Sequence, residues 1–145
     1  MALPPFREDG TLPIGEHVAS WAEFESRFGG GDRRMTLLNG LRAAMVELQQ
    51  VGCRTVWIDG SFVTSKAEPN DFDMCWDEAG VDVAALDPVF RSFANKRAAQ
   101  RARYGGDMFP AGARADVHGT TYRRFFQQRY GVAKGIVRID LVRPQ

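Results

Sequence analysis

The chain is 145 residues long, with 44% hydrophobic and 26% charged residues and a formal net charge of +1. This length accommodates one domain with a hydrophobic core and leaves little room for a second folded unit. No apolar run approaches the roughly 18 residues that cross a bilayer, and the N-terminus has no signal-peptide core, so no membrane segment is expected and a cytoplasmic location is predicted. Cys53 and Cys75 are too few for a disulfide framework and are expected to be buried free thiols.

The first 16 residues contain three prolines and two glycines, which favours an extended arm (1–16) over the body of the protein. Residues 17–145 are expected to form one folded domain. Ser20 and Glu23 have the spacing of a capping box, and the apolar residues around them recur on one helical face. The pattern predicts a short helix that contains Trp21, Phe24 and Phe28 and ends at the glycine run that follows.

Leucine and methionine residues at three- and four-residue spacing predict a long helix over residues 32–50. Asp32 is expected to cap its start, and Gly52 to end it. Two strands are predicted next, at residues 54–59 and 71–76, and a polar connection joins them.

The second half of the chain has weaker patterns. A helix is predicted within residues 83–103, and the glycines and the proline between positions 105 and 112 predict a loop. A short strand is expected at residues 113–118 and a short helix at residues 120–130.

A final strand, predicted at residues 136–142, carries one acid, Asp140, among apolar neighbours. Together the elements predict an α/β (α+β) fold, in which helices flank a small mixed β-sheet.

The most informative stretch contains two alternating acids. Asp71 and Asp73 alternate with Phe72 and Met74, so both carboxylates lie on one face of the strand, about 7 Å apart. Neighbouring carboxylates repel each other, and a divalent cation would remove that cost. Mg²⁺ binds through one or two carboxylates plus substrate phosphates, so the pair predicts a magnesium site. The alternative is a hairpin whose surface carries two exposed acids.

Gly60, Ser61 and Lys66, which precede this pair in the sequence, suit the phosphate groups of a substrate. Gly60 lets the backbone approach a phosphate closely, and Ser61 offers a hydroxyl and an N–H group. Lys66 is a candidate point charge for the phosphate chain, with a solvated surface role as the alternative.

Asp140 is the best candidate for a third carboxylate. If the last strand lies beside residues 71–76, the three acids converge and could hold two metal ions. The alternative for Asp140 is an edge-strand charge that discourages aggregation.

The segments Ile58-Asp59-Gly60-Ser61 and Asp71-Phe72-Asp73-Met74 resemble the signature of the DNA polymerase β-like nucleotidyltransferase superfamily. The match covers residues 54–76 closely and residues 135–142 loosely. The resemblance implies a nucleotidyltransferase-like domain in which Asp71 and Asp73 bind both metal ions and Asp140 completes the catalytic metal site. It also implies that Gly60 and Ser61 hold the triphosphate, and that the cofactor is Mg²⁺, two ions, with Mn²⁺ as an alternative.

The small size is similar to that of minimal nucleotidyltransferases from prokaryotic toxin–antitoxin or defence pairs. This resemblance implies an enzyme that moves an NMP from an NTP, ATP in the simplest case, to a hydroxyl of a partner protein or of an RNA such as tRNA. A cognate toxin or antitoxin would be the partner. Two alternatives stay open: a catalytically weak binding module that acts through protein–protein contacts in such a pair, and a simple RNA-binding protein.

Some charged residues have no assigned role at this point. Asp59 is acidic where the superfamily usually has a hydrophobic residue, and we expect it to turn into a hydrogen bond or a salt bridge. Asp107 lies in a glycine-rich stretch that does not decide its role. A set of arginines predicts either a polyanion-binding surface or a solvated face; it comprises Arg97, Arg101, Arg103, Arg114, Arg123 and Arg124.

Overall fold

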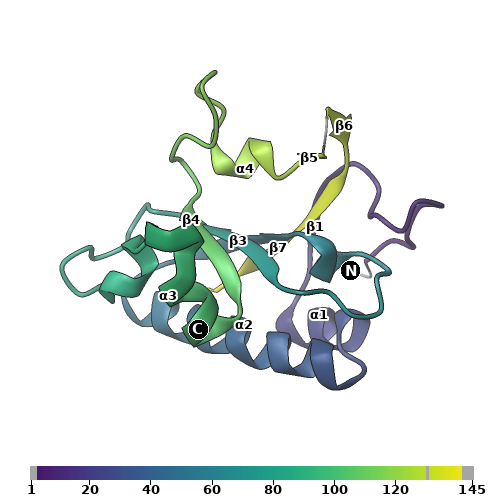
Figure 1. The fold of residues 1–145 in the computed structure, drawn as a ribbon, viewed down its shortest axis with the longest axis horizontal. Coiled ribbons are helices and arrows are strands. Elements are labelled where there is room, and N and C mark those ends of the chain that lie inside the picture. Colours follow the sequence, from purple (N-terminus) through teal and green to yellow (C-terminus); the bar gives the residue numbers. More distant parts are fainter. Residues whose placement is uncertain (1–2, 130, 142–145) are drawn as a thin grey trace.

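The computed structural model describes residues 3–129 and 131–141. Its main element is a mixed five-stranded sheet with the strand order β1-β7-β2-β3-β4 (Figure 1). β1 runs parallel to β7 and β3 parallel to β4, whereas β2 is antiparallel to both of its neighbours. The expected α+β architecture is therefore confirmed. The strands of this sheet are β1 (Gly15–Val18), β2 (Thr55–Asp59), β3 (Phe72–Trp76), β4 (Gly106–Pro110) and β7 (Gly135–Asp140).

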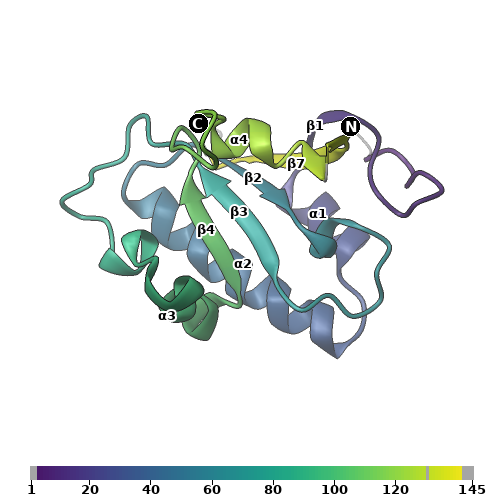
Figure 2. The same ribbon diagram turned by 45° about the horizontal axis from the view of Figure 1, so that its top comes forward.

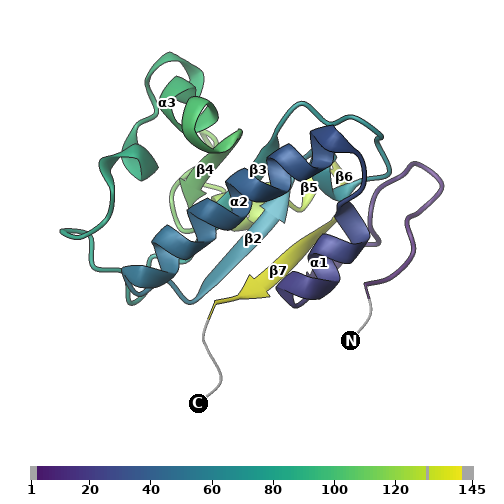
Figure 3. The same ribbon diagram turned by 90° about the horizontal axis from the view of Figure 1, so that it is seen from below.

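Helices cover the two faces of the sheet unequally. α1 and α2 lie along one face, whereas the short α4 and the β5–β6 hairpin lie over part of the other (Figure 1). α3 packs beside α2 at the β4 edge (Figure 3). Within the described ranges, no helix has both the length and the apolar character that a membrane span requires. The bounds are α1 (Trp21–Phe28), α2 (Asp32–Gln50), α3 (Ala94–Tyr104), α4 (Tyr122–Phe125), β5 (Gln128–Arg129) and β6 (Val132–Ala133), with 3₁₀ turns η1 (Ser61–Val63) and η2 (Pro88–Arg91).

Alternation along the strands divides the core into two layers. In β2, Val56 and Ile58 belong to the main core, which α1 and α2 cover. Trp57 points to the opposite face, where it packs with Cys75 in a smaller cluster that includes Phe126. α4 covers only part of this second face (Figure 2).

The first half of the chain follows the sequence prediction closely. α1 begins after Ser20, whose hydroxyl accepts a hydrogen bond from the Glu23 amide at 3.1 Å, as the capping pattern predicts. The long helix has the predicted bounds, but Gly31 rather than Asp32 takes its N-cap position. The N-terminal arm is shorter than predicted, because β1 already begins at Gly15 and pairs with β7.

The second half departs from the prediction. Residues 106–110 form β4 where a loop was expected, and the expected strand at residues 113–118 is wrong, since the bridge between Arg114 and Thr121 is isolated. The helix expected within residues 83–103 is realised as η2 and α3, and the one expected at residues 120–130 is reduced to α4.

Close packing explains why β4 resembles a loop in sequence. A Cβ added to Gly106 would lie 2.5 Å from the Phe72 ring, so glycine is required there by the neighbouring strand rather than by a turn. Pro110 ends the same strand at the sheet edge, where its missing N–H group does no harm. β7 ends at Asp140, and Val142 of the predicted last strand lies outside the described residues.

Candidate active site

Three aspartates lie side by side on the sheet face opposite α2. Asp59 ends β2 and pairs in register with Asp73 of β3, and Asp73 pairs in turn with Asp107 of β4. Neighbouring strands are about 4.8 Å apart, so the three side chains form one acidic row. Asp71, just before β3, lies at the same end, with its Oδ2 3.7 Å from Nη2 of Arg101, which also binds Asp107. The structure thus brings the predicted pair of acids together and adds two more.

The turn formed by Gly60 and Ser61 lies directly against this row. Gly60 has a φ of +88°, in the left-handed region that favours glycine. A Cβ at this position would lie 2.8 Å from Oδ2 of Asp73. Both the backbone conformation and the carboxylate therefore require glycine, and Ser61 follows at the start of η1.

A cavity of about 330 Å³ collects these groups, a volume within the range of small-molecule sites. Its lining combines acids and cations at one end of the sheet. It includes Gly60, Ser61, Lys66, Asp71 and Asp73 from the sequence prediction, together with Asp59, Arg129 and Lys134.

Asp73 is the acid whose charge the protein leaves uncompensated. It takes part in none of the ion pairs and side-chain hydrogen bonds found among the described residues. Burial, together with the nearby charges of Asp59, Asp71 and Asp107, raises the pKa of Asp73 to about 7. Burial and Asp107 also raise the pKa of Asp71. An added cation would therefore be stabilised most strongly beside these two carboxylates.

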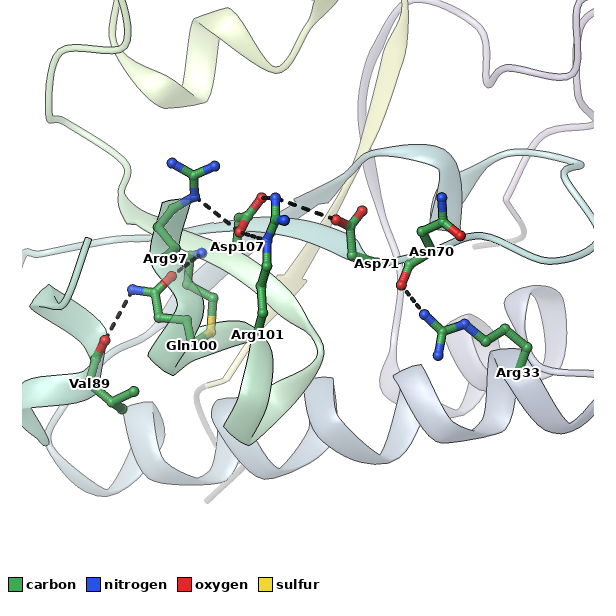
Figure 4. A network of polar contacts seen from close by, with 9 residues as sticks. Arg33, Asn70, Asp71, Val89, Arg97, Gln100, Arg101 and Asp107 are labelled. Carbon is green, nitrogen blue, oxygen red and sulfur yellow. Dashed lines mark hydrogen bonds and ion pairs between the residues drawn. The ribbon is translucent and has the colours of Figure 1, made fainter. Parts of the chain in front are cut away.

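Asp107, by contrast, is neutralised by two arginines of α3 (Figure 4). Arg101 binds it at both oxygens, with Nε 2.8 Å from Oδ1 and Nη2 2.9 Å from Oδ2. Nε of Arg97 lies 3.0 Å from Oδ1. Although burial favours the neutral acid, these arginines hold the pKa of Asp107 below its usual value. Asp107 is thus an ionised partner of α3 in this arrangement.

The helix that carries these arginines, α3, begins with a strained backbone. Residues 95–97 have positive φ angles of 52°, 56° and 63°, a conformation that costs about 1–2 kcal/mol for each non-glycine residue. The buried Gln100 holds the helix in place, because it donates to the Val89 carbonyl at 3.1 Å and accepts from the Met108 amide at 2.8 Å (Figure 4). The helix is therefore fixed to β4 one residue after Asp107.

Asp59 is held by Lys134 in an ion pair of two buried side chains. Lys134 also donates to the Phe126 carbonyl at 2.9 Å, which ties the chain after α4 to the sheet. The expectation that Asp59 turns into a salt bridge is confirmed. The pair places a cation at the edge of the cavity, next to Asp73.

Asp140 does not join the acidic row. β7 lies beside β2 rather than β3, and Asp140 pairs in register with Thr55, at the opposite end of β2 from Asp59. The intervening length of strand is about 13 Å. Its Oδ1 accepts from Thr55 Oγ1 at 3.1 Å and from Arg138 Nε at 2.9 Å. The expected convergence of Asp140 with the other acids is therefore wrong, because β2 lies between β7, which carries Asp140, and β3, which carries Asp73.

The buried Arg34 of α2 fixes the connection that follows Gly60. Its guanidinium donates to the carbonyls of Phe28 at 3.0 Å, Phe62 at 2.7 Å and Thr64 at 2.8 Å, and also to that of Lys66. The connection is thus ordered by a helix rather than by strand pairing. The sequence shows Arg34 only as a polar position of an amphipathic helix, so this role was missed.

The acids present fit one magnesium ion better than two. Asp71 and Asp73 provide the two carboxylates that Mg²⁺ commonly takes in addition to substrate phosphates. Among the residues described, no group of three or more His, Cys, Asp or Glu side chains is arranged to hold a metal ion. Asp107 is engaged by Arg97 and Arg101, so Asp71 and Asp73 are the two acids of the site without a bidentate or buried ion-pair partner.

Comparison with known proteins gives a family without an assigned activity. Neither the curated proteins nor the solved structures contain a match to this chain. A family profile, described as a family of unknown function (DUF6932), matches residues 4–140. The match includes every site residue discussed above, and the chain belongs to this family.

Proposed function

We propose that this protein is a Mg²⁺-dependent nucleotidyltransferase that moves an NMP from an NTP, ATP in the simplest case, to a hydroxyl group in the cytoplasm. The acceptor belongs to a partner protein or an RNA such as tRNA, and the setting is a toxin–antitoxin or defence pair. The observation that carries the proposal is the pairing of Asp71 and Asp73 with the Gly60-Ser61 turn in one cavity. The uncompensated charge of Asp73 supports it, because a folded protein has little reason to keep such a group without a ligand.

Each group in the cavity has a role in this proposal. Gly60 allows the triphosphate to approach the backbone, and Ser61 and Lys66 donate to its oxygens. Asp71 and Asp73 would hold the metal ion, whose contribution when bound is to neutralise charge on the phosphates. The acceptor oxygen bonds to the α-phosphorus, the bond to pyrophosphate breaks, and the hydroxyl proton leaves to water.

Incubation with each α-³²P-labelled NTP and Mg²⁺, in the presence of a cell extract that contains protein and RNA, tests the proposal. Label is expected on one protein or RNA band. The variant Asp71→Asn/Asp73→Asn should lose it, whereas Asp82→Asn, an exposed acid remote from the cavity, should retain it. Absence of transfer with every nucleotide, together with absence of NTP binding by calorimetry, would overturn the proposal.

A binding module without efficient catalysis is the second candidate, and the state of Asp107 favours it. A third acid that is neutralised by Arg97 and Arg101 supplies no further metal ligand. This candidate predicts tight NTP or partner binding without label transfer, so the same experiment separates the two.

A further inference from the structure

A second cavity, of about 290 Å³, lies on the same face of the sheet beside the acidic row. It is separate from the Gly60-Ser61 cavity, because the two share no lining residue. Its lining is aromatic and cationic, and contains no acid. The residues that line it are Phe93, Arg97, Phe109, Pro110, Ala113, Arg114 and Tyr122.

Three aromatic rings in this cavity are nearly parallel to one another. The rings of Phe109 and Tyr122 stack at a centroid distance of 4.0 Å with an interplanar angle of 6°. Phe93 lies parallel to Phe109, at 6.0 Å and 5°. Phe93 is 42% exposed, and the other two are half-buried. The outer side of such a ring stack, where it is open to solvent, is a surface on which a further flat ring can stack.

Two arginines provide the charge around these rings. The guanidinium carbon of Arg97 lies 5.3 Å from the centroid of Phe109. Nε of Arg97 faces Asp107, while its terminal nitrogens point away from that carboxylate (Figure 4). Arg114 is exposed and takes part in none of the ion pairs of the described chain. A ligand that stacks on the rings therefore meets donors suited to an anionic group.

One strand, β4, contributes residues both to the aromatic cavity and to the acidic row. Phe109 follows Asp107 by two residues in β4, so both side chains point to the same face, about 7 Å apart along the strand. Arg97 touches both, as an ion-pair partner of Asp107 and a cation over Phe109.

We propose that this cavity binds a nucleobase of single-stranded RNA, with the base stacked on the outer side of the Phe109–Tyr122 ring pair and the adjoining phosphate on Arg97 and Arg114. As a binding site it depends only on these contacts. Its further assignment, that the bound strand is the acceptor and presents its terminal hydroxyl to the Asp71–Asp73 pair, rests on the proposed function.

Charge and shape favour RNA over a peptide ligand. A proline-rich peptide also docks on aromatic grooves, but it carries no charge that would require two arginines at the rim. A base with its phosphate uses both parts of the lining, since every base has a π face and the backbone is anionic. The whole chain has a net charge of only +1, so two arginines and no acid in one cavity lining are a local concentration of positive charge.

Fluorescence anisotropy with a labelled single-stranded RNA of about eight nucleotides measures the predicted binding. Tyr122→Leu should weaken affinity about tenfold or more, whereas Tyr122→Phe, which keeps the ring, should bind as the wild type does. Arg114→Ala should weaken binding and make it less dependent on salt, with the slope reduced by about 0.7. Phe125→Leu and Arg42→Ala are matched controls, since both side chains are exposed and lie outside the cavity.

Photo-crosslinking of 4-thiouridine RNA locates the base independently of folding effects. Crosslinks at Phe93, Phe109 or Tyr122 support the proposal. Crosslinks confined to other segments, or RNA affinity equal in Tyr122→Leu and wild type, would overturn it. So would tight binding of a proline-rich peptide by a chain that does not bind RNA.

NTP binding, measured by calorimetry on the same variants, separates this inference from the proposed function. Tyr122→Leu should bind NTP normally. RNA binding at the aromatic cavity without any nucleotidyl transfer would retain the site and remove the proposed function. Transfer of label to a protein hydroxyl, with no RNA binding, would retain the proposed function and overturn the inference.

Discussion

Asp73 and Asp107 occupy paired positions on the adjacent parallel strands β3 and β4, but only Asp107 has cationic partners among the described residues. Two arginines neutralise Asp107, whereas Asp73 has no ion-pair partner of its own among these residues, and burial with three neighbouring acids raises its pKa to about 7 although Lys134 lowers it. The uncompensated charge of the site is thus concentrated on Asp73, next to Gly60. This asymmetry makes several properties of the protein measurable without knowledge of its substrate.

The stability of the ligand-free protein should fall as the pH rises from about 4 to about 7. Asp73 binds its proton more tightly in the folded than in the unfolded state, because its folded pKa exceeds the ordinary value of 3.8. Its contribution is therefore present at low pH and lost as the pH rises through 7. The loss amounts to at most about 4 kcal/mol. Urea unfolding across this pH range measures it.

Asp73→Asn is the matched variant, since asparagine has nearly the same shape and no charge. It should be more stable than the wild type above about pH 7 and should differ little at about pH 4. The same variant should lose Mg²⁺-NTP binding. Equal pH profiles for the two proteins would show that Asp73 has an ordinary pKa, and would remove the electrostatic argument for a cation site.

Arg101→Gln should increase the response of the protein to Mg²⁺. The substitution removes the bidentate partner of Asp107 and leaves Arg97 as its one remaining arginine, so that Asp107 can join Asp71 and Asp73 at a metal ion more easily. Without Mg²⁺ the variant should lose about 1 kcal/mol of stability, because Arg101 is partly exposed and solvent screens the pair. Thermal melts over a Mg²⁺ titration should show a larger rise in Tm than for the wild type.

Arg103→Gln provides the control for this effect. It removes an ion pair with Asp87 from the same helix, but on a surface away from the acidic row. Its Mg²⁺ response should equal that of the wild type. If Arg101→Gln also leaves the Mg²⁺ response unchanged, Asp107 is not a potential metal ligand.

Asp140→Asn should retain Mg²⁺-NTP binding and any transfer activity within about twofold. The carboxylate lies at the far end of β2, where it contacts Thr55 and Arg138. Loss of these surface contacts should change stability by about 0.5 kcal/mol or less. Calorimetry with NTP and urea unfolding measure the two quantities. A large loss of NTP affinity would restore the role that the sequence alone suggests for this acid.

The error over Asp140 shows what local sequence can and cannot provide. Alternation places Asp71 and Asp73 on one face, and a glycine after a strand indicates the Gly60-Ser61 turn, because both are local properties. The choice of a third acid depends instead on which strands are neighbours. A lone acid in an apolar strand was the strongest local signal, and it selected Asp140 over Asp107.

The sequence did not identify Asp107 as a strand residue of the site, because β4 has the composition of a loop. Gly106 is required by contact with Phe72, a residue distant in sequence, and Pro110 ends the strand. The signal that was available is the alternation of Asp107, Met108 and Phe109, since Met108 is fully buried while the other two share the opposite face. Three residues are too few to outweigh the flanking glycines and proline.

Lys134→Met should destabilise the protein by about 3–5 kcal/mol, because it leaves Asp59 buried without its cation. It should also leave Asp59 as a second uncompensated acid next to Asp73. The two residues act on the pKa of Asp73 in opposite directions, because Lys134 lowers it and Asp59 raises it. The double variant Asp59→Asn/Lys134→Met removes both charges and should recover much of the loss. Urea unfolding of the wild type, both single variants and the double variant completes the cycle. Equal stability of Lys134→Met and wild type would mean that Asp59 is neutral in the folded protein, and that the acidic row contains one charge fewer than the ion pair implies.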